Sequence, residues 1–298
     1  MSIQSESANG EEHQETRELV MSAFALARSL GIKTLVVQAG EIDDVLLVKG
    51  LRVDERVIWI ARDAEQIPHF DRTRDVVLDM PDVALNRLSQ LNLALFLAAL
   101  NRQFGLEERV LGLSGVTGSM RLDTLIIAKP ARDYPWLQQH KSEVSITRHL
   151  AKLLEIALRF AQEGREGSAI GATFVLGDGQ ELAPYLRQLV LNPLKGHSQA
   201  VRSIHNPDFI ETIRELSAMD GAFVVNRRGA MDSACTYLDA PVGPGQLSPG
   251  LGSRHASALA MTTVTRATAV VISSSSGTVS VYDNGQVVLE LERATASA

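Results

Sequence analysis

The sequence predicts a two-domain α/β protein, with a three-layer α/β domain of mainly parallel sheet followed by a mixed-sheet α/β domain. The first observation is length, because 298 residues exceed one ordinary hydrophobic core. The second is the alternation of short apolar runs with segments of helical periodicity, which is typical of α/β folds. The third is the stretch of residues 129–139, where Pro130 and Pro135 among charged and aromatic residues interrupt that alternation.

These observations place the domain boundary near residue 140. Residues 1–15 are polar and acidic and are expected to form a disordered tail, residues 16–140 the first domain and residues 141–298 the second. The start lacks the basic-then-apolar pattern of a secretory signal, and the most apolar window, residues 91–100, is about half as long as a membrane span. We therefore expect a cytoplasmic protein with no membrane partner.

The first domain is predicted from apolar spacing and turn residues. A helix from Arg17 is expected to end at Gly31, a residue suited to helix C-termini. Asp82 precedes a segment that is apolar on most sides, which predicts a buried helix over residues 83–104. Short apolar runs predict strands at residues 34–38, 56–60, 76–78, 110–113 and 124–128.

The second domain opens with an amphipathic helix around residues 146–161. Asn206 followed by Pro207 predicts a capped helix start, and a proline- and glycine-rich loop over residues 241–252 precedes a helix at 255–268. Strands are expected at residues 167–176, 222–226, 231–238, 269–273, 278–282 and 287–291.

Composition restricts the partners. The net charge of −6 argues against nucleic acid as the main partner, because no basic excess exists to neutralise phosphates. One triphosphate needs merely a local cluster of donors, so a nucleotide stays open as a ligand. The single cysteine, Cys235, excludes an intrachain disulfide and a cysteine-based metal site.

Asp220-Gly221-Ala222 lies where a predicted helix meets a predicted strand. A carboxylate there can hold a divalent metal or polarise a hydroxyl, and a glycine beside it lets a phosphate approach the backbone. An ordinary helix-to-strand turn explains the same tripeptide.

Gly252-Ser253-Arg254-His255 follows the glycine-rich loop at a predicted helix start. The helix N-terminus, the guanidinium and the hydroxyls of Ser253 and Ser257 make this a favourable anion site. Arg-His also occurs at residues 148–149, where we interpret it as solvated helix surface.

Two further features indicate chemistry less specifically. Residues 113–119 could form a phosphate-binding nest, although an ordinary polar turn accounts better for them. His197 and His205 lie in predicted loops without a carboxylate or cysteine at ligand spacing, so no dedicated zinc site is expected.

Four segments in order resemble the signature of the diadenylate cyclase domain over about residues 143–291. They are residues 171–178 (GATFVLGD), 219–223 (MDGAF), 250–255 (GLGSRH), and 270–273 (VVIS) before 277–279 (GTV). The presence of an α/β domain before them resembles archaeal-type members, whose first domain is similar to the pyruvate kinase C-terminal domain. That resemblance implies a first domain that serves oligomerisation or regulation.

The resemblance implies condensation of two ATP into cyclic di-AMP, with release of two pyrophosphates, between two face-to-face subunits. The active unit would then be at least a homodimer. Asp220 would activate the 3′-hydroxyl and, with His255, hold Mn²⁺ or Mg²⁺. Arg254 is implied as a third catalytic residue, which holds the triphosphate. The remaining implied residues bind substrate: Ser253 and Ser257 at the triphosphate, Gly221, Ala222 and Leu238 at the nucleotide pocket, and Gly252 and Ser273 beside them.

The sequence departs from the family pattern at Ala256, where many members carry a second arginine, and at Ser274, where some carry a glutamate. Arg227, Arg228 and Arg266 are the candidates to replace the missing guanidinium. One alternative is therefore a weak or inactive member that binds a nucleotide or cyclic di-AMP as a sensor. Another is a different nucleotidyl transfer, with a linear product or another nucleotide.

Overall fold

The computed structural model describes the chain except residues 1, 43–44, 62–64, 66, 68–69, 72–73, 79, 82, 117–118, 135–143, 166–167, 242–251 and 295–298. Asp82, the end of the predicted linker and most of the predicted glycine-rich loop lie outside the described residues. The chain divides into two compact units, Met1–Gln139 with Ala294–Ala298, and His140–Arg293.

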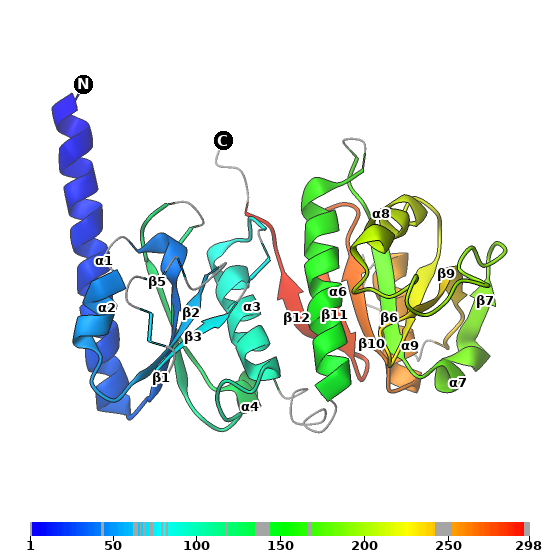
Figure 1. Cartoon of the computed structure of the whole chain (residues 1–298), viewed down its shortest axis with the longest axis horizontal. Coiled ribbons are helices and arrows are strands. Elements are labelled where there is room, and N and C mark those ends of the chain that lie inside the picture. The colour runs from blue at the N-terminus through cyan, green and yellow to red at the C-terminus, as the bar shows by residue number, and fades with distance from the viewer. Residues whose placement is uncertain are drawn as a thin grey trace. The chain divides into compact units, whose positions relative to one another are not determined.

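The first unit is a three-layer α/β fold, as predicted (Figure 1). Its five strands are ordered β3-β2-β1-β4-β5, with β4 and β5 antiparallel and the other pairs parallel. The strands are β1 (Thr34–Gln38), β2 (Arg56–Ile60), β3 (Asp75–Leu78), β4 (Val110–Ser114) and β5 (Thr124–Ala128). The helices are α1 (Ser2–Leu30), α2 (Val45–Leu51), α3 (Arg87–Leu100), α4 (Pro130–Asp133) and the 3₁₀ turn η1 (Ala39–Glu41).

Helices cover both faces of this sheet. One hydrophobic cluster joins α1 and α2 to the sheet through residues such as Phe24, Val48 and Trp59, while α3 packs on β3 and β4. Gly31 ends α1 in a left-handed conformation (φ +67°), and the N–H of Ile32 donates to the carbonyl of Ala27, as in a Schellman cap.

Two predictions for this unit need correction. The expected disordered tail is part of α1, which begins at Ser2; most residues of this stretch tolerate a helix, and the packed turns after it supply the nucleus. The long buried helix begins at Arg87, because Asn86 caps it by accepting from the N–H of Ser89, and it ends at Leu100.

The second unit contains a mixed sheet, as predicted, but with a seventh strand, β7, that was not expected; the order is β12-β11-β10-β6-β8-β9-β7. β6 and β8 are parallel, and the other pairs are antiparallel. The strands are β6 (Ala172–Gly177), β7 (Leu186–Gln188), β8 (Ala222–Asn226), β9 (Met231–Leu238), β10 (Thr268–Ile272), β11 (Val279–Asp283) and β12 (Gln286–Leu291).

Helices α6 (Val144–Glu163) and α9 (Ser253–Val264) both pack on the central strands β6, β10 and β11. In Figure 1, α6 lies in front of this sheet and α9 behind it. The short α7 (Gly179–Leu182), the 3₁₀ turn η3 (Ala183–Tyr185) and α8 (Pro207–Leu216) fill the connections. No helix among the described residues is long and apolar enough to cross a membrane.

Candidate functional site

Two cavities lie beside the N-terminus of α9. The larger, called here the Asp220 cavity, has a volume of about 600 Å³ and the smaller, the His255 cavity, about 480 Å³. Ser253 and Arg254 line both cavities. The first turn of α9 therefore separates two recesses and contributes side chains to each.

Asp220 is an exposed residue in the turn between α8 and β8. Gly221 after it has a φ of +108°, and a Cβ there would lie 2.5 Å from the carbonyl carbon of Cys235. Cys235 on β9 is itself left-handed (φ +53°), and the β8–β9 register shifts near Ala222. Gly221 and Cys235 thus both have a strained backbone and lie close together, which fixes the position of Asp220 at the start of β8.

The N-terminus of α9 supplies donors to the Asp220 cavity. Gly252 is its N-cap and has no side chain to accept from the first N–H groups, which leaves them available to an anion. The Arg254 guanidinium lies against Gly171, where a Cβ would stand 2.7 Å from Nη1. Positive charge and helix N–H groups therefore converge on one end of this cavity.

His255 lies in the other cavity. Its Nδ1 is 2.9 Å from the hydroxyl of Tyr282, and burial lowers the pKa of the imidazole, with Arg254 adding to the shift and Glu290 opposing it. Burial, with Glu290, raises the pKa of Tyr282 to about 12. The imidazole is therefore neutral at pH 7, the form that ligates metals.

The predicted residues divide between the two cavities. The Asp220 cavity contains Asp220, Gly221, Ala222, Leu238 and Ser257, and the His255 cavity contains Gly252, His255 and Ser273. Within one chain, the two residues expected to share a metal, Asp220 and His255, therefore line different recesses.

Several lining residues were not predicted from the sequence. The Asp220 cavity is also lined by Thr173, Leu189, Thr236, Tyr237 and Ala240, and the His255 cavity by residues that include Ser275, Ser276, Tyr282 and Glu290, beside Ser274. Thr236 could have been predicted from Leu238, because residues two apart on a strand such as β9 lie on the same face. Thr173 carried no comparable signal, because it lies within an apolar strand.

The residues present fit a divalent ion that arrives with a nucleotide. Among the described residues no group of three or more His, Cys, Asp or Glu side chains could hold a metal by itself. Asp220 is the acidic residue of its cavity lining, beside the donors of Arg254 and Ser253. Magnesium is commonly held by one or two carboxylates together with substrate phosphates, and this donor set matches that pattern.

The departure at Ala256 leaves a small side chain in the wall of the Asp220 cavity. Neither cavity lining includes Arg227, Arg228 or Arg266 in the described part of the chain. Arg254 is therefore the arginine that both linings contain.

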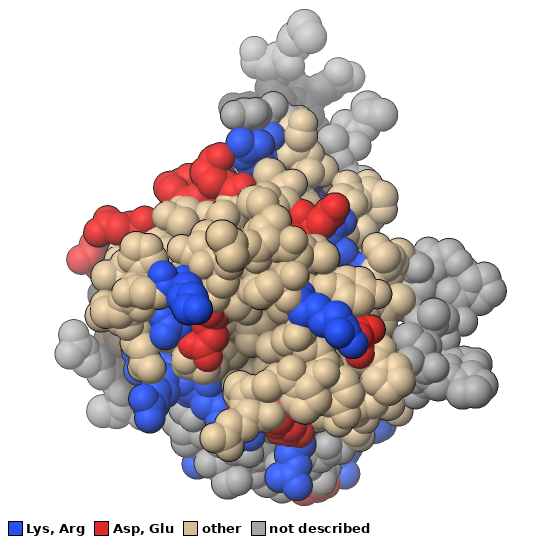
Figure 2. Space-filling view, turned by 90° about the vertical axis from the view of Figure 1, so that its right-hand side faces the viewer, with Lys and Arg blue, Asp and Glu red and all other residues tan. Residues whose placement is uncertain are grey.

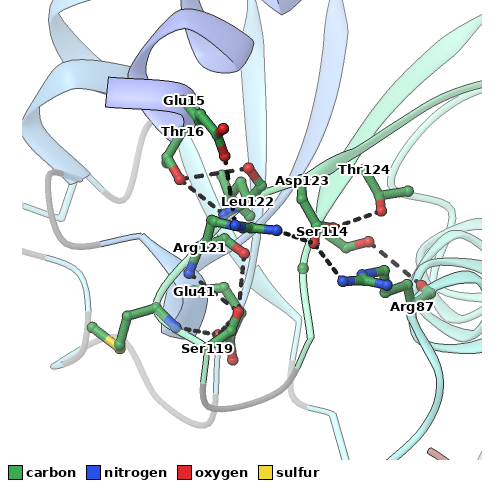
Figure 3. A network of polar contacts seen from close by, with 12 residues as sticks. Glu15, Thr16, Glu41, Arg87, Ser114, Ser119, Arg121, Leu122, Asp123 and Thr124 are labelled. Carbon is green, nitrogen blue, oxygen red and sulfur yellow. Dashed lines mark hydrogen bonds and ion pairs between the residues drawn. The ribbon is translucent and has the colours of Figure 1, made fainter. Parts of the chain in front are cut away.

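The loop after β4 belongs to the first unit, at the carboxyl ends of the neighbouring parallel strands β1 and β4 (Figure 3). Glu41 is 3% exposed, and its Oε2 accepts from the N–H of Met120 at 2.8 Å and from the hydroxyl of Ser119 at 3.2 Å. The Oε1 of Gln38 accepts from the N–H of Gly115 at 3.2 Å. Side chains of the chain itself thus occupy these donors, which favours the structural interpretation of this loop over a phosphate nest.

The interpretation of Arg148-His149 as solvated surface is wrong for the histidine. His149 is 7% exposed, and its Nδ1 lies 2.9 Å from Nε2 of His205. Gly229 makes room for the ring, since a Cβ there would lie 2.6 Å from its Cε1. The buried face of α6 is therefore wider than the spacing of its apolar residues predicted. It includes the imidazole of His149, which is buried together with a hydrogen-bonding partner.

We expect this pair to make the second unit less stable in acid. Burial is the main cause that lowers the pKa of both rings. His205 and Arg148 lower the pKa of His149 further, and Arg148 also lowers the pKa of His205. The unfolded chain then binds protons first, so the free energy of unfolding decreases as pH falls below about 6.5. Urea unfolding at pH 7.5 and 5.5 measures this loss.

The double variant H149Q/H205Q should show a smaller difference between the two pH values than the parent. His197→Gln, at an exposed loop histidine, is the matched control and should leave the difference unchanged. Equal pH dependence in the double variant and the parent would contradict the assignment.

The end of the second unit that carries β7 is formed mostly by uncharged residues, with charged groups scattered over it (Figure 2). The charges that it shows stand mainly as neighbouring blue and red groups on a broad uncharged surface. Ion pairs of this region include Arg187 with Asp239 and Arg202 with Asp232. Leu189, Leu191 and Tyr237 are 50%, 95% and 51% exposed, so an apolar surface adjoins the Asp220 cavity.

Comparison with known proteins identifies the second unit. Residues 159–287 match the family described as DisA bacterial checkpoint controller nucleotide-binding. A diadenylate cyclase of Methanocaldococcus jannaschii is 37% identical over 145 residues, covering 49% of this chain and 46% of the relative. A diadenylate cyclase of Haloferax volcanii is 33% identical over 141 residues, covering 47% and 51%.

The second unit is therefore similar over residues 159–287 to the family described as DisA bacterial checkpoint controller nucleotide-binding. The chain spans about half the length of the curated relatives it matches.

Two solved structures are also similar. A hypothetical membrane spanning protein from Bacillus cereus has a TM-score of 0.34 at 19% identity, covering 54% of this chain and 74% of that one. A double mutant of DacA from Staphylococcus aureus has a TM-score of 0.31 at 22% identity, covering 50% and 87%.

Proposed function

We propose that the second unit condenses two ATP into cyclic di-AMP and releases two pyrophosphates. The observation that carries this proposal is that the Asp220 carboxylate and the donors of Arg254 and α9 face one cavity of about 600 Å³. A carboxylate suited to a hydroxyl and a cationic end suited to phosphates are the two groups that nucleotidyl transfer needs.

In the proposed reaction each 3′-oxygen forms a bond to the α-phosphorus of the other ATP, and the bond from that phosphorus to pyrophosphate breaks. Asp220 accepts the hydroxyl proton. Arg254, Ser253 and Ser257 hold the triphosphate, and Gly221, Ala222 and Leu238 line the nucleotide pocket, with Gly252 and Ser273 at the neighbouring recess. Mn²⁺ or Mg²⁺, held by Asp220 and His255 with the phosphates, supplies charge neutralisation when bound.

We propose that two subunits pair face to face to complete this site. Each subunit places Asp220 and His255 in different cavities, so pairing can bring the Asp220 of one copy toward the His255 of another. The uncharged surface beside the Asp220 cavity, with Leu189 and Leu191 exposed, suits a contact between copies. The active form is then at least a homodimer.

The first unit has no proposed part in the chemistry. Its mainly parallel five-stranded sheet supports the interpretation of residues 16–140 as a pyruvate kinase C-terminal-like domain that oligomerises or regulates. The proposed consumption of ATP requires a nucleotide-rich compartment, so we place the protein in the cytoplasm.

A second candidate function is a nucleotide or cyclic di-AMP sensor without turnover. Ala256 in the cavity wall favours it, because one guanidinium fewer is available to the phosphates. Incubation of the full chain with ATP and Mn²⁺ or Mg²⁺, with chromatographic identification of products, separates the candidates. Cyclic di-AMP and pyrophosphate support the cyclase, and nucleotide binding without either product supports the sensor.

Gly171→Ala should weaken ATP binding and also lower stability. The added methyl group would lie 2.7 Å from Nη1 of Arg254 and 2.8 Å from Cβ of Ser274, so the flexible guanidinium moves away but the backbone at Ser274 must shift. We expect KM for ATP to rise roughly tenfold, the size of one lost charge-assisted hydrogen bond, and the melting temperature to fall.

Gly40→Ala in the first unit is the matched control, since a Cβ there meets nothing within 4 Å. An unchanged KM in Gly171→Ala would show that the position of Arg254 over Gly171 is irrelevant to binding.

A further inference from the structure

One buried hydroxyl in the wall of the Asp220 cavity lacks a partner. Thr173 on β6 is 3% exposed, and its Oγ1 has no hydrogen-bond partner within the described part of the chain. The same residue lines the Asp220 cavity. A buried hydroxyl without a partner is destabilising, which points to a partner that the chain itself does not provide.

Other buried threonines of this unit are satisfied. Thr236, also in the cavity wall, shares a hydrogen bond of 2.8 Å with Ser233 and accepts from the side-chain amide of Gln188. The hydroxyl of Thr262 donates to the carbonyl of Ala258 at 2.9 Å. Thr173 is therefore distinguished by its chemistry and by its position in the cavity.

The position of Thr173 indicates which part of a nucleotide it would meet. Gly171, on the same face two residues earlier, lies beneath the Arg254 guanidinium, about 7 Å along the strand. On β8, Phe223 pairs with Phe174, so Ala222, directly after the Asp220-Gly221 turn, is the residue that precedes this pair as Thr173 does on β6. The apolar wall from Leu189 and Leu238 belongs to the β7 and β9 side of the cavity. Thr173 thus lies in the cavity wall near the end that carries both the Asp220 turn and the Arg254 guanidinium, where a sugar–phosphate fits better than a base.

We propose that Thr173 is a nucleotide-positioning residue whose hydroxyl hydrogen-bonds the ribose–phosphate part of the bound nucleotide. The inference rests on the proposed function, because it takes a nucleotide as the ligand of the Asp220 cavity. A hydroxyl both donates and accepts, so it can bond a sugar hydroxyl or a phosphate oxygen. Because the group is neutral, it contributes orientation more than charge.

The test compares Thr173→Val, which keeps the shape and removes the hydroxyl, with Thr173→Ser, which keeps the hydroxyl. Calorimetric titration of the full chain with a non-reacting α,β-methylene analogue of ATP gives Kd, and thermal unfolding without ligand gives the melting temperature. We expect Thr173→Val to raise Kd about 3- to 10-fold and to leave the melting temperature equal or higher, because an unpartnered hydroxyl is lost. Thr173→Ser should bind like the parent.

Thr262→Val is the control, since it removes a buried hydroxyl that has its partner outside the cavity. It should leave Kd unchanged. A Thr173→Val protein with parental Kd overturns the inference. If its melting temperature is also lowered, the hydroxyl has a structural role instead.

The outcome is distinguishable from failure of the proposed function. A parent chain that binds the analogue but forms no cyclic di-AMP from ATP refutes the cyclase and leaves the Thr173 comparison valid. A parent chain that binds no nucleotide refutes both.

Discussion

Asp220→Asn is expected to lower cyclic di-AMP formation by about 10²- to 10⁴-fold, the range of a lost general base. Asparagine keeps the size and the hydrogen-bonding shape of the side chain but accepts no proton at neutral pH, and it is a poorer ligand for Mn²⁺ or Mg²⁺. Asp220 is exposed, so the fold should be unaffected. Initial rates of pyrophosphate release, with the product identified by chromatography, measure the effect.

Asp54→Asn, at an exposed aspartate of the first unit, is the matched control for charge removal. It should retain the parental rate, and both variants should unfold at the parental temperature. An Asp220→Asn protein that keeps more than about a tenth of the parental rate contradicts the assigned role, because a lost general base costs more than this.

Gly221→Ala is expected to have the largest effect on stability of any single methyl group considered for this chain. The φ of +108° disfavours any side chain, and the new Cβ would stand 2.5 Å and 2.6 Å from backbone atoms of Cys235 and Thr236. Backbone atoms of a paired strand cannot rotate away as a side chain can. We expect a loss of about 3 kcal/mol in the free energy of unfolding, together with displacement of Asp220 and loss of activity.

Gly196→Ala separates the two causes. Gly196 has a comparable φ of +93°, but a Cβ there meets nothing within 4 Å. It should lose about 1 kcal/mol, the cost of the backbone conformation alone. Equal losses in the two variants, measured by urea unfolding, would show that the close passage of β8 and β9 adds nothing.

Most sheet strands could be predicted closely because apolar runs and turn residues define them locally, but β7 was not predicted and β6 starts at Ala172 rather than at residue 167. The bounds expected for β1, β2, β5, β8 and β9 agree with the structure. Helix ends were harder to predict. At α3 the capping residue is Asn86, and the apolar residues before it lie outside the helix. A cap is a side-chain hydrogen bond, and the choice among several polar residues depends on the fold.

The two site motifs could be found from sequence because each combines a charged residue with a glycine at the end of an element. Their separation into two cavities could not, since it depends on how the first turn of α9 projects between them. The role of Thr173 could not be predicted from the sequence for another reason. Its hydroxyl matters because it has no partner, and a missing hydrogen bond leaves no trace in an amino-acid pattern.

Glu41 gives the first unit a hydrogen-bond acceptor of its own at the carboxyl ends of β1 and β4. Because this carboxylate is tethered to the fold, it is presented to the N–H of Met120 at an effective concentration in the millimolar range or above. A free anion from solution would have to outcompete it at these donors and would also leave Glu41 buried without them. In the described part of this loop, side chains of the chain itself thus take the place that a phosphate oxygen would have.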